Sequence, residues 1–96
     1  MNQSQLLANK YKLPESREIS LGRDKFGWRG FQELPLNRDI EALMTLALIN
    51  NVTVNAKNDD YVITEGMQSA CVKYYDDHPT ELDALCEALC EALLAE

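Results

Sequence analysis

The stretch TELDALCEALCEALLAE (residues 80–96) repeats apolar residues at the three- and four-residue spacing of a helix that buries one face. The apolar positions are Leu82, Leu85, Cys86, Leu89, Cys90 and Leu93. Thr80 can cap the first turn, where the helix dipole favours acidic residues. Asp83, Glu87 and Glu91 form a second row at i, i+4 spacing. We therefore predict an acidic amphipathic helix over residues 80–96.

The whole net charge of −7 lies in the last quarter of the chain. Residues 1–73 carry nine Lys or Arg and nine Asp or Glu, whereas residues 74–96 carry seven acids and no base. Like charges at i, i+4 spacing repel by about 0.2–0.5 kcal/mol per pair. Because a basic partner would relieve this repulsion, the helix is a candidate recognition element.

The rest of the chain mixes strand and helix patterns. We predict strands over residues 18–21 and 26–32, a helix over 38–50, a hairpin over 52–64 and a helix over 65–75. The 38–50 helix is predicted to be the central core helix, with Asn37 as its N-cap. These elements predict a small single α+β domain with two short antiparallel β-hairpins and about three α-helices, ending in the acidic helix.

The length of 96 residues suits one domain. Pro14 ends the first segment, so residues 1–16 are predicted to be a flexible or short-helical N-terminal arm and residues 17–96 a single α+β domain. The chain has neither a run of about 18 apolar residues nor an apolar leader, which predicts a cytoplasmic protein without a membrane partner.

Three cysteines, Cys71, Cys86 and Cys90, are interpreted as reduced packing residues. Cys86 and Cys90 lie four residues apart on one predicted helix, where a disulfide is geometrically awkward. Together with His78 they offer three potential metal ligands, but the CxxC spacing of zinc sites is missing. No metal and no cofactor is expected.

The predicted terminal helix supplies the first candidate site, with Asp83, Glu87, Glu91, Leu85 and Leu89 as partner-binding residues. The acids would meet a basic groove, and the leucines an apolar one. Three alternatives stay open: the stripe packs on the body of the domain, it forms a homodimer through residues 80–96, or the acids imitate the phosphates of DNA.

The second candidate site is the segment RDKFGWRGF (residues 23–31), in which three basic residues alternate with three aromatic ones. Trp28 and Arg29 are candidate protein contacts, because Trp and Arg are favoured anchors at interfaces. Such a segment can also hold single-stranded nucleic acid. The sequence pI of about 4.6 argues against nucleic acid as the main ligand. The structural alternative is a hairpin whose rings lie in the core.

Catalysis has little support in the sequence. The one histidine, His78, lies in a predicted loop, and no serine lies in a nucleophile-elbow motif. No glycine-rich phosphate loop is present either. We therefore predict a protein that is not an enzyme.

In size, composition and element order the chain resembles the small early-region accessory proteins of temperate phages and prophages of enteric bacteria. The resemblance is carried by residues 52–64 and by TELDALCEAL (residues 80–89). It implies a non-enzymatic protein that binds and modulates a host or phage protein, as a regulator or a defence inhibitor. The alternatives are a small nucleic-acid-associated protein using residues 23–31 and a purely structural homodimeric subunit.

Overall fold

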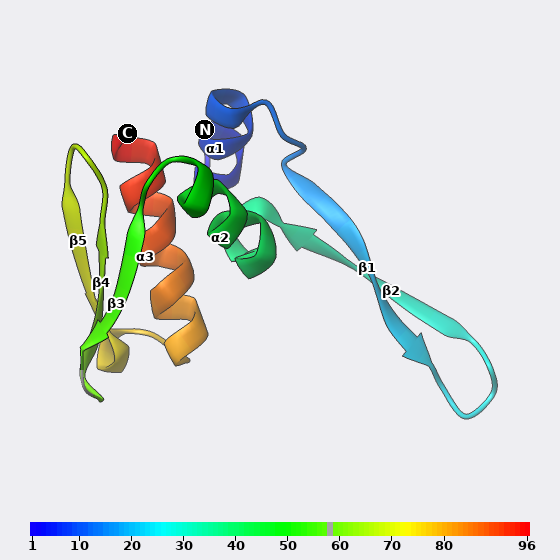
Figure 1. Ribbon diagram of the computed structural model, residues 1–96. Helices are drawn as coiled ribbons and strands as arrows, with labels where there is room; N and C mark the ends of the chain where they lie inside the picture. The colour runs from blue at the N-terminus through cyan, green and yellow to red at the C-terminus, as the bar shows by residue number, and fades with distance from the viewer. Residues whose placement is uncertain (58) are drawn as a thin grey trace.

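A computed structural model describes residues 1–57 and 59–96 and shows a small α+β domain with two antiparallel sheets (Figure 1). Its elements are α1 (Gln3–Tyr11), β1 (Ser16–Arg23), β2 (Arg29–Pro35), the 3-10 turn η1 (Leu36–Arg38), α2 (Ile40–Ile49), β3 (Thr53–Lys57), β4 (Tyr61–Glu65), β5 (Ala70–Tyr74), the 3-10 turn η2 (Tyr75–Asp77) and α3 (Glu81–Ala95). The predicted fold class is confirmed, including the helix at the C-terminus. No helix in the described part of the chain is long and apolar enough to cross a membrane.

The centre of the fold is α3, which lies between the β3–β4–β5 sheet on one side and α1 and α2 on the other (Figure 1). Toward the sheet it presents Ala84 and Ala88, which pack against Val62 of β4. These small side chains let the strands come close enough for the Thr64 hydroxyl to donate a hydrogen bond to the Ala88 carbonyl oxygen over 2.8 Å. Toward α1 and α2 it presents larger side chains, which are Cys86, Leu89, Cys90 and Leu93.

The prediction that the helix over 38–50 is central was wrong in one respect. Helix α2 forms as expected but buries only Leu43, Leu46 and Ala47. Its outer face stays open, with Leu48 81% exposed. The chain supplies no layer to cover that face, because α3 is already enclosed between the sheet and the other helices.

The predicted N-cap of α2 is also corrected. Asp39, rather than Asn37, caps the helix, and its Oδ1 accepts a hydrogen bond from the Ala42 amide over 3.2 Å. Asn37 instead lies in η1, where its backbone amide donates a hydrogen bond to the buried Ser4 hydroxyl of α1 over 3.0 Å.

The predicted hairpin over 52–64 is confirmed as β3 and β4, but the helix predicted over 65–75 was wrong. Residues 70–74 form β5, which pairs antiparallel with β4. Its side chains alternate: Cys71 and Lys73 are half-buried beneath α3, whereas Val72 and Tyr74 are exposed. Because three strands packed on a helix are far more stable than an isolated hairpin, tertiary packing decided this segment.

The sequence allowed either a flexible or a short-helical N-terminal segment. The structure shows the helix α1, which packs on α3. Leu7 is fully buried in the core. At the C-terminal end of α3, the Leu93 carbonyl oxygen accepts hydrogen bonds from Lys10 Nζ (2.9 Å) and from the Tyr11 hydroxyl (2.5 Å). A cation at the last turn of a helix also complements its dipole.

We expect the substitution Leu89→Ala to lower the free energy of unfolding by about 2–5 kcal/mol, because it leaves a cavity in the core. The matched control on the same helix is Leu82→Ala, at a side chain that is 52% exposed, and its effect should stay within about 0.5 kcal/mol. Urea denaturation followed by circular dichroism measures both. Equal losses in the two variants would contradict the position of α3 described here.

Candidate functional site

The acidic row of α3 is paired within the chain. The pairs join Asp83 Oδ1 to Arg38 Nη1 (2.7 Å), Glu87 Oε2 to His78 Nε2 (2.6 Å) and Glu91 Oε1 to Lys73 Nζ (2.9 Å). The partners come from η1, from the segment before α3 and from β5. The repulsion along the row is therefore offset by Arg38 and Lys73, and by His78 when its ring is protonated.

The two leucines of the first candidate site are not on the surface either. Leu89 is fully buried, and Leu85 is half-buried against both core clusters. The structure thus places Asp83, Glu87 and Glu91 in ion pairs, and all of the apolar stripe except the exposed Leu82 in or against the core. The stripe that would have formed a homodimer through residues 80–96 is covered by the chain's own α1, α2 and β4.

The thiols are unsuited to nucleophilic chemistry. Burial raises the pKa of Cys90 to about 12, and burial together with the Glu91 carboxylate raises the pKa of Cys71 to about 11. Burial raises the pKa of Cys86 as well. All three therefore stay protonated near neutral pH. Across residues 1–57 and 59–96, no group of three or more His, Cys, Asp or Glu is placed to hold a metal ion.

The second candidate site lies on a projecting arm, the two-stranded ribbon of β1 and β2 (Figure 1). Every residue from 20 to 33 is exposed, so this part of the ribbon has no core face. Its large apolar side chains are Leu21 (61% exposed), Phe26 (74%), Trp28 (76%) and Phe31 (57%). The alternative in which these rings form part of the core is therefore corrected. Charged residues lie between the apolar residues of both strands, so neither face of the ribbon is apolar. This pattern was the sequence feature that indicated an exposed ribbon.

The tip of the arm is an ordered loop, and the strand predicted from Phe26 begins only at Arg29. The Asp24 carboxylate accepts hydrogen bonds from the amides of Phe26 (2.9 Å) and Trp28 (3.0 Å). Gly27 has a φ of 84°, a left-handed conformation that costs glycine little. The loop thus fixes its backbone internally and leaves both rings to solvent.

The base of the arm is fixed to the body by the ion pairs of Arg17. Arg17 of β1 donates from Nε to Asp39 Oδ2 (2.5 Å) and from Nη2 to Asp39 Oδ1 (3.0 Å). This hydrogen-bonded pair lowers the pKa of Asp39, whose side chain is only 4% exposed. Arg17 also reaches Glu41 Oε2 over 3.2 Å. The same carboxylate therefore caps α2 and holds the ribbon.

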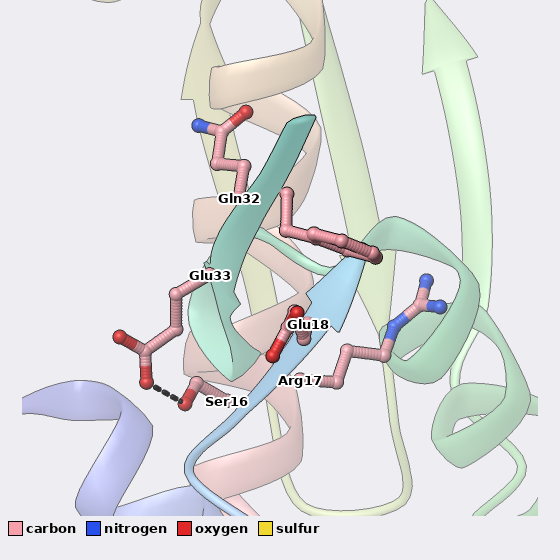
Figure 2. A pocket seen from close by; sticks show the side chains of 6 residues that line it. Ser16, Arg17, Glu18, Gln32 and Glu33 are labelled. Carbon is pink, nitrogen blue, oxygen red and sulfur yellow. Dashed lines mark hydrogen bonds between the residues drawn. The ribbon is translucent and has the colours of Figure 1, made fainter. Parts of the chain in front are cut away.

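Above this base the ribbon is hollowed by a concavity of about 520 Å³ (Figure 2). It is lined by Ser16, Arg17, Glu18, Phe31, Gln32 and Glu33. Figure 2 shows Arg17 extending to the opposite side from Glu33, which accepts a hydrogen bond from the Ser16 hydroxyl over 2.6 Å. The sequence did not single out Leu21, Glu18 or Glu33 as surface features, because their meaning depends on the strand register.

No protein-family model, no curated protein and no solved structure matches this chain. The candidate site therefore rests on its geometry.

We expect Asp39→Ala to lower the free energy of unfolding by about 2–3 kcal/mol, because it removes a helix cap and leaves Arg17 without its bidentate partner. Asp39→Asn keeps an oxygen acceptor for the Ala42 amide, so it should cost only about 1 kcal/mol. Chemical denaturation measures both variants. Equal costs would show that the carboxylate charge contributes nothing to holding the arm.

We also expect the stability of the protein to fall as the pH rises above neutrality. Both ring nitrogens of His78 face an oxygen, Nδ1 that of the Tyr74 carbonyl (3.0 Å) and Nε2 that of Glu87 (2.6 Å). Only the protonated ring donates to both, so the carbonyl and then the carboxylate raise the pKa of His78 above 6.5. This contribution is fully present below the unfolded pKa and is lost as the pH rises through the raised folded pKa.

The measurement is urea denaturation of the wild type and of His78→Gln between about pH 5.5 and pH 8.5. The wild type should lose stability across this range relative to the variant. Parallel profiles would contradict the role given to His78.

Proposed function

We propose that this chain is a protein-binding module that engages its partner with the tip of the β1–β2 arm. The observation that carries the proposal is the exposure of Phe26 and Trp28 on an ordered loop at the end of a projecting ribbon. Aromatic residues are favoured anchors at protein interfaces, because they bury a large area with few rotatable bonds.

The free ribbon supports this proposal. A two-stranded hairpin without a hydrophobic face is at best marginally stable in water. Residues 20–33 gain no burial from the body of the domain, yet four of them carry large apolar side chains. Covering those side chains with a partner would therefore stabilise the ribbon and remove apolar surface from water at the same time.

The charges of the tip define the chemistry of the partner. Arg23, Lys25 and Arg29 surround the two rings, while the Asp24 carboxylate is bound to amides of its own loop. We infer a partner with an apolar pocket and an acidic rim. This differs from the basic partner expected from the sequence, since the acids of α3 are already paired.

Occupation of such a pocket is how a small non-enzymatic protein would regulate or inhibit its target. The resemblance to phage and prophage accessory proteins suggests a host or phage protein as that target. The body of the domain then serves as a rigid base that carries the arm.

The test is affinity capture from nuclease-treated cell lysate with the wild type, with Phe26→Ala, Trp28→Ala, and with the control Met67→Ala. Met67 is 80% exposed but lies outside the arm, in the β4–β5 connection. A protein captured by the wild type and the control should be lost with both tip variants. Its affinity, measured afterwards by calorimetry, should fall about 30-fold on removal of Trp28.

Melting temperatures of the two tip variants should match the wild type, because neither ring packs in the core. Equal capture by tip variants and wild type would overturn the proposal.

The nucleic-acid alternative is tested with labelled single-stranded oligonucleotides and fluorescence anisotropy. Binding that weakens steeply with salt, and that is lost when Arg23, Lys25 and Arg29 are changed to Gln, would favour phosphate recognition instead. We expect no such binding, because the rest of the protein is strongly acidic.

A further inference from the structure

The register of the β1–β2 ribbon places like charges directly opposite each other at two positions. Glu18 pairs with Glu33, and Arg23 pairs with Arg29. Like charges at opposed positions of an antiparallel pair destabilise it. The ribbon therefore has an acidic pair near its base and a basic pair near its tip, and each is unfavourable within one chain.

Both pairs lie on the same face. The two members of a cross-strand pair point to one side, and positions two residues apart on a strand share that side. On β2, Arg29, Phe31 and Glu33 follow this spacing, and the bulge between Ser20 and Gly22 brings Arg23 opposite Arg29. From base to tip, this face therefore carries the acidic pair, then Ser20 opposite Phe31, and then the basic pair.

The charges at the two ends of this face are largely unused. Within residues 1–57 and 59–96, the side chains of Glu15, Glu18 and Arg29 take part in no hydrogen bond or ion pair. Glu15 adds a third acid beside the base, where it lines a concavity with Ser16 and Glu33. Lys25 adds a third cation at the tip, with its Nζ 5.1 Å from the centre of the Phe26 ring.

We propose that this face binds a second copy of the chain, with the two ribbons antiparallel and a two-fold axis through the Ser20–Phe31 pair. That axis exchanges base and tip, so Glu18 and Glu33 of each copy meet Arg23 and Arg29 of the other. Every like-charge pair then gains two opposite charges. The exposed Phe31 ring of each copy packs at the centre of the contact.

Self-complementarity of this kind is what a closed two-fold dimer requires, since one patch has to serve both sides of the interface. The partner's tip reaches the concavity beside Glu15, so each arm also contacts the other body. The ribbon face is narrow, which makes the dimer a weak one, at the low end of interface sizes. This inference goes beyond the proposed function. It does not use Phe26 and Trp28, which belong to the loop, but it shares Arg23 and Arg29 with the proposed acidic-rimmed partner, so the second copy and that partner would compete for these two residues.

The experiment is sedimentation equilibrium of the full chain from micromolar to millimolar concentration, with two charge-reversal variants. One is the double variant Glu18→Lys, Glu33→Lys, and the other is Arg23→Glu, Arg29→Glu. Each variant keeps like charges opposite each other at the altered positions. The first leaves only basic charged residues at the four paired positions of the face, and the second only acidic ones. We expect the wild type to dimerise and to do so less at high salt, and each variant alone to associate at least about 100-fold more weakly.

The decisive sample is an equimolar mixture of the two variants. Each brings the charges that the other lacks, so the mixture should form a heterodimer with an affinity close to that of the wild type. The control double variant Glu65→Lys, Glu81→Lys changes as much charge at exposed positions of the body and should dimerise normally. Circular dichroism confirms that every variant is folded.

Three results would overturn the proposal. They are a wild type that stays monomeric at millimolar concentration, a dimer that survives both reversals and so uses another surface, and folded variants that fail to associate when mixed.

Discussion

One helix has to serve two layers in this fold, and the rest of the structure depends on that constraint. The alanines of α3 allow the β3–β4–β5 sheet to approach on one side, while its leucines and cysteines fill the space beneath α1 and α2. Once both sides of α3 are covered, no further layer of the described residues 1–57 and 59–96 packs on the body, and the outer face of α2 stays open. Residues 20–33 of the β1–β2 ribbon pack on none of these layers, and the ribbon projects from the body (Figure 1).

The electrostatics of the chain follow the same division between body and arm. In the body, the acidic row of α3 faces Arg38, Lys73 and His78, so three of the seven acids in residues 74–96 have a partner at close range. In the arm, Glu18 and Arg29 have no such neighbours. A net charge summed over a segment therefore did not reveal that Asp83, Glu87 and Glu91 have partners within the chain, because it ignores which side chains the fold brings into contact.

Much of the fold could be predicted from the sequence because two segments have a regular spacing of apolar residues. Residues 80–96 keep a helical spacing throughout, and residues 52–64 alternate around a turn. Residues 65–75 were misassigned because Met67, Ala70, Cys71 and Tyr74 also fit a helical face. Their strand alternation becomes clear only when Cys71 and Lys73 are seen beneath α3. For the candidate site, the basic and aromatic residues of 23–31 drew attention to a segment whose large apolar side chains the structure leaves exposed. Whether Trp28 lies in a core or in solvent depends on whether other elements of the chain pack against it. The local sequence pattern does not contain that information.

The arm contributes no residue to the buried core, and the ion pairs of Arg17 fix its base. Selection for a stable fold consequently constrains residues 20–33 only weakly, because all of them are exposed. A substitution at Trp28 or Phe31 should leave the stability of the domain nearly unchanged. The body and the arm can then evolve at different rates, because close packing around α3 constrains substitutions in the body, whereas no such packing constrains residues 20–33.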